Sequence, residues 1–154
     1  MAKQKLIVGI DIGGINTAFG FIQEDSKCFF SSTLTTNPNE DVDIFIERLS
    51  NKINTDFRNY SPDYTLSGIG IAAPMANHLN GTIETPSNIK WNNVRFVERI
   101  NKIFNVPTAI INDANAAALG EYEYGLGKGL KNFIAITLGT GLGCGIIIDG
   151  NLHE

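Results

Sequence analysis

Two glycines beside an acidic residue form the first segment that could do chemistry. Asp11-Ile12-Gly13-Gly14 lies between an apolar run and a second strand-like run. Adjacent glycines let the backbone approach a ligand closely and expose N–H groups that suit phosphate oxygens. A carboxylate next to them can hold a hydrated Mg²⁺. The alternative is a glycine-rich hairpin turn, and the pattern is not the G-x-G-x-x-G fingerprint that opens a helix.

A second glycine-rich segment, Thr137-Leu138-Gly139-Thr140-Gly141, lies between two strongly apolar strands. Its alternating glycines and hydroxyls make another loop of the size of a phosphate group. A tight hairpin is again the alternative reading. A two-residue hairpin turn needs fewer glycines than are present, so the pattern favours a phosphate site.

An amide and a carboxylate follow a short buried strand at Asn112-Asp113. Ligands of open α/β sheets lie at the carboxyl ends of the strands, which is where these two side chains fall. Asp113 can serve as a general base that orients and deprotonates a substrate hydroxyl, the role an aspartate has in kinases. It can also simply cap the helix that follows.

The elements that must position these segments follow the order β-β-β-α-β-α-β-α and then a hairpin. Strands are expected at 5–11, 17–23, 27–35, 65–73, 108–111, 133–138 and 142–148. Helices are expected at about 40–58, capped near Asn37, at 94–104, and at 114–124 before Gly125. Residues 78–93 are expected to be a polar loop, and residues 149–154 a hairpin turn without its return strand. Strands that alternate with helices indicate a parallel section of sheet with helices on both faces, and the opening three strands add an antiparallel meander.

Five segments together resemble the ROK family of sugar kinases and repressors, and within it the bacterial glucokinases. They are Asp11-Ile12-Gly13-Gly14, Gly70-Ile71-Ala72-Ala73-Pro74, Thr85-Pro86-Ser87-Asn88-Ile89-Lys90-Trp91, Asn112-Asp113-Ala114-Asn115-Ala116-Ala117 and Thr137-Leu138-Gly139-Thr140-Gly141-Leu142-Gly143. The resemblance implies an α/β fold of the actin-like ATPase (ribonuclease H-like) type with a mixed sheet. It also implies that residues 1–154 are the N-terminal ATPase and sugar kinase domain of a longer two-domain protein.

The resemblance implies a hexose and ATP with Mg²⁺ as ligands, and it assigns roles by position. The residues facing phosphate would be Asp11, which also holds Mg²⁺, with Gly13, Gly14, Thr137, Gly139, Thr140 and Gly141. The residues facing sugar hydroxyls would be Asn88, Asn112 and Asp113, with Asp113 also the catalytic base. Buried amide and carboxylate groups select such ligands because an unmatched polar group is costly.

Two departures from the family pattern stand out. Ile15 replaces the usual threonine of the first glycine segment, so a hydroxyl that would meet phosphate is lost, and Thr17 is the nearest residue that could replace it. The sugar-binding G-E-x-G-H segment and the His/Cys zinc cluster of the family do not occur in this sequence. His153-Glu154 comes before the position at which the family has its sugar-binding Glu and His. No zinc ligand is therefore expected in these residues.

Composition narrows the remaining functions. The net charge of −4 gives no basis for binding nucleic acid, and no apolar run is long enough to cross a membrane. Cys28 and Cys144, without a Cys/His cluster, are expected to be buried free thiols of a cytoplasmic protein, with a disulfide or metal pair as the alternative. A hexose kinase is the favoured function. A family repressor or a non-catalytic sugar- or nucleotide-binding module is the alternative, and the resemblance allows a homodimer.

Overall fold

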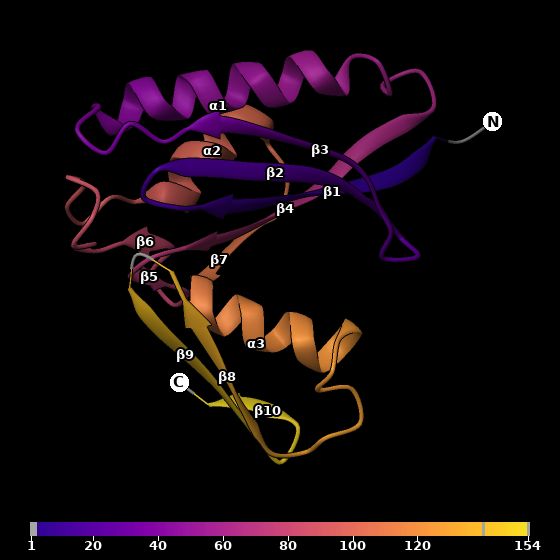
Figure 1. Ribbon diagram of the computed structural model, residues 1–154. Coiled ribbons are helices and arrows are strands. Elements are labelled where there is room, and N and C mark those ends of the chain that lie inside the picture. The colour runs from indigo at the N-terminus through magenta and orange to yellow at the C-terminus, as the bar shows by residue number, and fades with distance from the viewer. Residues whose placement is uncertain (1–2, 140, 154) are drawn as a thin grey trace.

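A five-stranded mixed sheet forms the centre of the computed structural model, which describes residues 3–139 and 141–153 (Figure 1). Its strand order is β3-β2-β1-β4-β7. β1 (Gln4–Ile12), β2 (Asn16–Gln23) and β3 (Cys28–Thr35) form the antiparallel meander. β4 (Tyr64–Ala73) and β7 (Thr108–Asn112) extend the sheet from β1 in parallel. The predicted mixed sheet with an antiparallel opening is therefore confirmed.

Helices lie on both faces of this sheet, as predicted. α1 (Val42–Phe57) and α2 (Phe96–Phe104) cover one face, and α3 (Asp113–Tyr124) lies on the other side (Figure 1). The main hydrophobic core fills the space between the first face and the helices. It includes the alternating inward side chains of β1 together with the apolar stripe of α1, namely Leu6, Val8, Ile10, Phe45, Leu49 and Ile53. Strand period two and helix period 3.6 thus produce one shared core.

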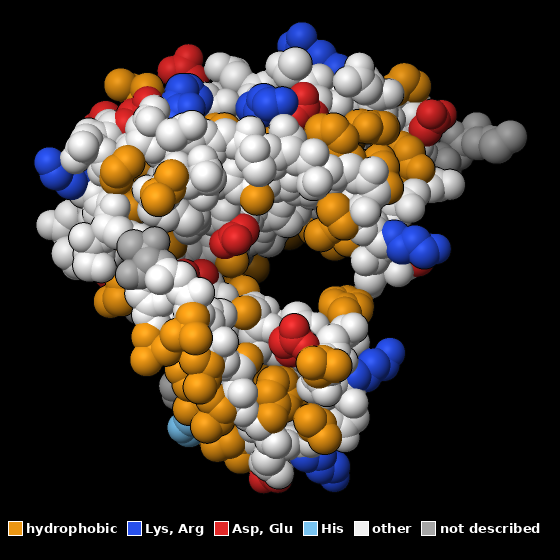
Figure 2. All heavy atoms as spheres, viewed as in Figure 1, with side chains coloured by type: hydrophobic (Ala, Val, Ile, Leu, Met, Phe, Trp, Pro, Cys, Tyr) orange, Lys and Arg blue, Asp and Glu red, His pale blue; other side chains and the backbone are white. Residues whose placement is uncertain are grey.

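A second sheet packs on α3. It has the order β10-β9-β8, from β8 (Phe133–Leu138), β9 (Leu142–Ile148) and β10 (Asn151–His153). The expectation that residues 149–154 lack a return strand is wrong, because β10 pairs antiparallel with β9. Figure 2 shows an opening between this unit and the main body. At one end the hydroxyls of Ser26 and Tyr124 lie 3.0 Å apart and connect the β2–β3 turn to α3.

Two local expectations are corrected. The polar loop predicted for 78–93 overlaps a short hairpin, in which β5 (Ala76–Asn77) pairs with β6 (Thr82–Ile83). The cap of α1 is Asp41, whose carboxylate accepts the Asp43 N–H at 2.8 Å. Asn37 instead takes a left-handed turn conformation with φ of 52°, so it lies outside the helix that it was expected to cap.

Both cysteines are exposed free thiols, so the expectation that they are buried is wrong. Cys28 begins β3, which is an edge strand of the main sheet. In β9, Gly143 and Gly145 face α3, and strand alternation turns Cys144 to the opposite side. Within 3–139 and 141–153, no helix combines the length and apolar character that a membrane crossing requires.

Candidate active site

Two acidic residues meet at the carboxyl edge of the main sheet. Asp11 lies near the end of β1, opposite Ala72 of β4, while Ala73 of β4 lies opposite Asn112 at the end of β7. Asp113 follows directly. The pKa of Asp11 is raised above its usual range, first by partial burial of its carboxyl and then by the negative charge of Asp113. Two residues about a hundred positions apart in sequence thus share one electrostatic environment.

The carboxylate of Asp11 suits a divalent cation. Mg²⁺ is bound in proteins through one or two carboxylates together with water and the phosphates of a substrate. The side chain of Asp11 is open enough to reach a ligand, and a bound cation would favour the charged carboxylate that burial and then the charge of Asp113 disfavour. Asp11 therefore fits such an ion, and Asp113 is close enough to influence its charge. No cluster of three or more His, Cys, Asp or Glu side chains with metal-binding geometry occurs among the described residues.

The first glycine turn joins β1 to β2 beside this pair. The Gly13 N–H donates to the carbonyl oxygen of Asn16 at 3.0 Å and closes the turn. A β-carbon at Gly14 would lie 2.4 Å from Nδ2 of Asn88, so only glycine leaves room for that side chain. The half-buried Asn88 therefore contacts the turn, although it comes from the loop before α2. The structure brings together a predicted phosphate residue and a predicted sugar residue.

Asn112, rather than Asp113, is the cap of α3. Its Oδ1 accepts the N–H groups of Ala114 at 3.1 Å and Asn115 at 3.4 Å. Asp113 stands in the first turn, where its Oδ1 also accepts the Ala114 N–H at 2.9 Å. A carboxylate in the first turn of a helix is stabilised by the helix dipole. The capping role that the sequence left open for Asp113 thus belongs mainly to its neighbour, and Asp113 is exposed at the sheet edge.

The second glycine turn joins β8 to β9, and the Gly139 N–H donates to the Gly141 carbonyl at 3.0 Å. Thr140 lies outside the described residues. The hairpin can pack closely on α3 because Gly143 and Gly145 have no β-carbons, which would lie 2.9 Å and 2.5 Å from atoms of Ala114. Thr137 lies opposite Gly143 in the ladder and is half-buried. Contact with Ala114, the residue after Asp113, is what places this hairpin next to the acidic pair.

Two surface grooves differ in whether predicted site residues line them. One of about 510 Å³ is formed by the loop that carries Asn88 together with Pro38 and Asn39. A larger groove of about 890 Å³ lies between the β5–β6 loop, α2 and β7, and none of the predicted site residues lines it. Size therefore does not identify the site. The acidic pair and the contact between Gly14 and Asn88 are instead what mark the candidate site.

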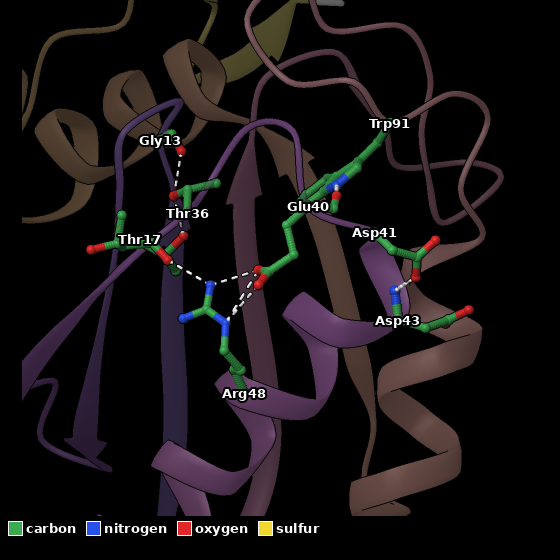
Figure 3. Close-up of polar contacts among 9 residues, drawn as sticks. Gly13, Thr17, Thr36, Glu40, Asp41, Asp43, Arg48 and Trp91 are labelled. Carbon is green, nitrogen blue, oxygen red and sulfur yellow. Dashed lines mark hydrogen bonds and ion pairs between the residues drawn. The ribbon is translucent and has the colours of Figure 1, made fainter.

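The burial of two threonines beneath the first glycine turn was not predicted from the sequence. Thr17 and Thr36 are fully buried, and their hydroxyl oxygens lie 2.9 Å apart (Figure 3). Thr17 therefore cannot supply the hydroxyl that Ile15 lacks, and Ile15 itself is 66% exposed. One signal was available. Thr17 has the same strand parity as the buried Phe19 and Phe21, so its hydroxyl had to find a partner inside the protein.

The chain is similar to known proteins over almost its whole length. The ROK family model matches residues 7–154. A glucokinase of Streptomyces coelicolor is 36% identical over 149 residues, which cover 97% of this chain and 45% of the relative. A xylose repressor of Bacillus spizizenii is 34% identical over 153 residues, covering 96% of this chain and 38% of the repressor.

A solved structure is also similar to this chain. A ROK family glucokinase from Streptomyces griseus, in complex with glucose and AMPPNP, superimposes with a TM-score of 0.80 at 33% identity, covering 96% of this chain and 46% of that one. The chain thus spans about half the length of the relatives it matches. The match covers nearly all of the chain and includes every segment that forms the sheet edge described above. The chain belongs to the ROK family.

Proposed function

We propose that the protein carrying this chain transfers the γ-phosphoryl group of ATP to a hydroxyl of a hexose, and that the hexose is glucose. The similarity to glucokinases and to a structure holding glucose and AMPPNP supports this proposal. Because the chain spans about half of those relatives, the activity is proposed for the whole protein and not for these residues alone. These residues contribute the nucleotide turns, the acidic pair and part of the sugar contacts.

The observation that carries the proposal is the electrostatic proximity of Asp11 and Asp113 at one sheet edge. Phosphoryl transfer requires positioning and charge neutralisation more than covalent help from the protein. One carboxylate that can hold Mg²⁺ and one that can accept a proton are the two groups that such a reaction needs. Mg²⁺, when bound with ATP, would neutralise charge on the phosphates.

Asp113 is proposed to accept the proton of the sugar hydroxyl. The hydroxyl oxygen then forms a bond to the γ-phosphorus as the bond between that phosphorus and the β–γ bridging oxygen breaks, and ADP leaves with that oxygen. Asn88 and Asn112 are proposed to hydrogen-bond neighbouring sugar hydroxyls. Asn112 Oδ1 is already engaged by the amides of α3, so its Nδ2 is the group with which it would bind an oxygen of the sugar.

A sugar-responsive regulator is the second candidate, because the xylose repressor matches the chain nearly as well as the glucokinase does. Both kinds of protein would bind sugar. They differ in turnover, since a regulator has no need to release ADP.

The deciding experiment is an assay of the full-length protein for ADP release with Mg-ATP, over a panel of hexoses and N-acetylhexosamines. Isothermal titration with the same sugars is run in parallel. Sugar-dependent ADP release that is largest with glucose supports the proposal. Sugar binding without any sugar-dependent ADP release would favour the regulator, and release that is largest with another sugar would correct the substrate.

A further inference from the structure

A chain of hydroxyl groups lies buried beneath the first glycine turn. Thr36 Oγ1 is 2.7 Å from the carbonyl oxygen of Gly13 and 2.9 Å from Thr17 Oγ1 (Figure 3). A carbonyl oxygen only accepts, so the single proton of Thr36 goes to Gly13. Thr17 must then donate its own proton to Thr36. Because each hydroxyl carries one proton, the hydrogen bonds run from Thr17 to Thr36 and from Thr36 to Gly13.

Thr36 also holds the turn through its backbone. Its N–H donates to the carbonyl oxygen of Ile15 at 2.8 Å. The carbonyls on either side of Gly14 are therefore both bound by one residue, one through the side chain and one through the main chain. Thr36 is fully buried, so it supports the turn from behind and does not itself reach a ligand.

The residues around Thr36 reach the loop that carries Asn88. We call residues 35–40 the bridging segment. Pro38 accepts the Lys90 N–H at 2.9 Å, and the carbonyl of Glu40 accepts the Trp91 Nε1–H at 3.2 Å. The bridging segment thus binds the glycine turn through Thr36, and it binds the loop of residues 85–92 through Pro38 and Glu40.

Arg48 of α1 fixes the bridging segment to the helix. Its guanidinium binds both carboxylate oxygens of Glu40, with Nη2 2.7 Å from Oε2, and it also donates to the carbonyl of Thr35 at 2.9 Å (Figure 3). A planar guanidinium that binds two points at once restrains orientation more strongly than a single contact does. Arg48 therefore anchors the bridging segment to α1, while the segment itself binds the glycine turn and the loop of residues 85–92.

We propose that Thr36 is a positioning residue for the phosphate turn, and that the bridging segment sets this turn in place against the loop of Asn88. The inference rests on the proposed function for its consequence in catalysis. Its structural part stands without it, because the hydrogen bonds of Thr36 hold Gly13 and Ile15 whatever ligand is bound.

The test compares variants of the full-length protein. Thr36→Val keeps the shape of the side chain and removes the hydroxyl, whereas Thr36→Ser keeps the hydroxyl. Ser67→Ala is the matched control: Ser67 Oγ donates to the Leu6 carbonyl at 2.9 Å, so it makes the same kind of bond at the opposite end of β1. The first measurement is amide hydrogen exchange of residues 13–17 without ligand. The second is the Kd for AMPPNP with Mg²⁺, together with KM for ATP and for glucose.

Thr36→Val is expected to speed exchange of these amides and to raise the Kd for AMPPNP, each roughly tenfold, which is the loss expected for one hydrogen bond of about 1.4 kcal/mol. KM for ATP should rise more than KM for glucose. Thr36→Ser should behave as wild type, and Ser67→Ala should leave residues 13–17 unchanged. If Thr36→Val does not fold, Thr17→Val replaces it, with a smaller increase in exchange because Thr36 can still donate to Gly13.

Wild-type exchange at residues 13–17 in the hydroxyl-free variant would overturn the inference, as would an equal effect from Ser67→Ala. A failure of the proposed function looks different. In that case the wild-type protein would show no sugar-dependent ADP release, and the exchange measurement would still decide whether Thr36 positions the turn.

Discussion

Nδ2 of Asn88 lies only 2.4 Å from the position that a β-carbon of residue 14 would occupy. Gly14 is therefore needed for its small size, since the contact leaves no space for a methyl group. The contact joins the turn proposed to hold phosphate to the side chain proposed to hold sugar. Phosphoryl transfer requires close alignment of its two substrates, and direct packing of the two proposed sites would favour that alignment.

Gly14→Ala is expected to push the Asn88 side chain aside and to raise KM for the sugar about as much as Asn88→Ala does. The shifted atoms are the end of a side chain, so the melting temperature should change little. In the Asn88→Ala background, Gly14→Ala should have little additional effect on the sugar KM. Gly120→Ala is the control, because a β-carbon there meets nothing within 4 Å. Fully additive effects on the sugar KM would show that the two residues act separately.

Asp113→Asn is expected to abolish most of the turnover and to leave nucleotide binding nearly intact. A general base contributes roughly 10²–10⁴-fold to a rate. The amide keeps the size of the side chain but cannot accept the hydroxyl proton. The measurements are kcat by ADP release and the Kd for AMPPNP. A variant that retains most of the wild-type kcat would exclude Asp113 as the base.

The same substitution should lower the pKa of Asp11. Burial, the larger cause of the raised pKa, remains in Asp113→Asn, so the value should fall toward 3.8 without reaching it. A native pKa above the unfolded value means that the folded state binds the proton more tightly. The free energy of unfolding should therefore decrease as pH rises from 3.8 through the folded pKa of Asp11, and this decrease should be smaller in the variant. Carboxyl NMR titration and denaturant unfolding at several pH values provide the check.

Ile15→Thr is expected to strengthen nucleotide binding. Ile15 is 66% exposed at the turn and has no hydroxyl. Thr17 is buried and its hydroxyl is hydrogen-bonded to Thr36, so neither residue offers a hydroxyl to a phosphate. A hydrogen bond to a charged group contributes roughly 1.5–3 kcal/mol, which corresponds to a decrease in the KM for ATP of about tenfold or more. Ile15→Val is the control for branching at the β-carbon. If both variants lower the KM equally, the hydroxyl is not the cause.

Much of the fold follows from periodicity. The alternation of Leu6, Val8 and Ile10 and the helical spacing of Phe45, Leu49 and Ile53 each predict the face that the structure buries. The hairpin β5–β6 was missed because two-residue strands have too few residues to show a period. The cap of α1 was misplaced because Asn37 and Asp41 both precede the apolar stripe, and only the left-handed backbone of Asn37 distinguishes them.

The members of the candidate site can be proposed from the sequence more readily than their arrangement can. Asp11 was identified beside two glycines and Asp113 after a buried strand, and the order of the strands in the sheet places both at one edge. The support beneath the glycine turn was not predictable, because it depends on Thr36 and Arg48, which lie in other elements and carry no local pattern. Contacts between distant segments require the register of the sheet, which sequence spacing does not specify.

The outer face of β8 and β9 should cause the 154-residue chain to self-associate. Ile134, Ile136, Leu138 and Leu142 are 61%, 64%, 85% and 75% exposed on the side of the hairpin away from α3. A contiguous apolar patch of this kind is removed from water when two copies meet. Light scattering of the 154-residue chain should therefore give a mass above 16.7 kDa that increases with concentration. Ile134→Lys with Ile136→Lys should restore the monomer mass, because charges on the face cannot be buried cheaply. Leu79→Lys, at an isolated residue 81% exposed in the β5–β6 loop, is the control and should not change the association. A wild-type chain that stays monomeric at all concentrations, or a control that dissociates as fully as the double variant, would contradict the assignment of association to this face.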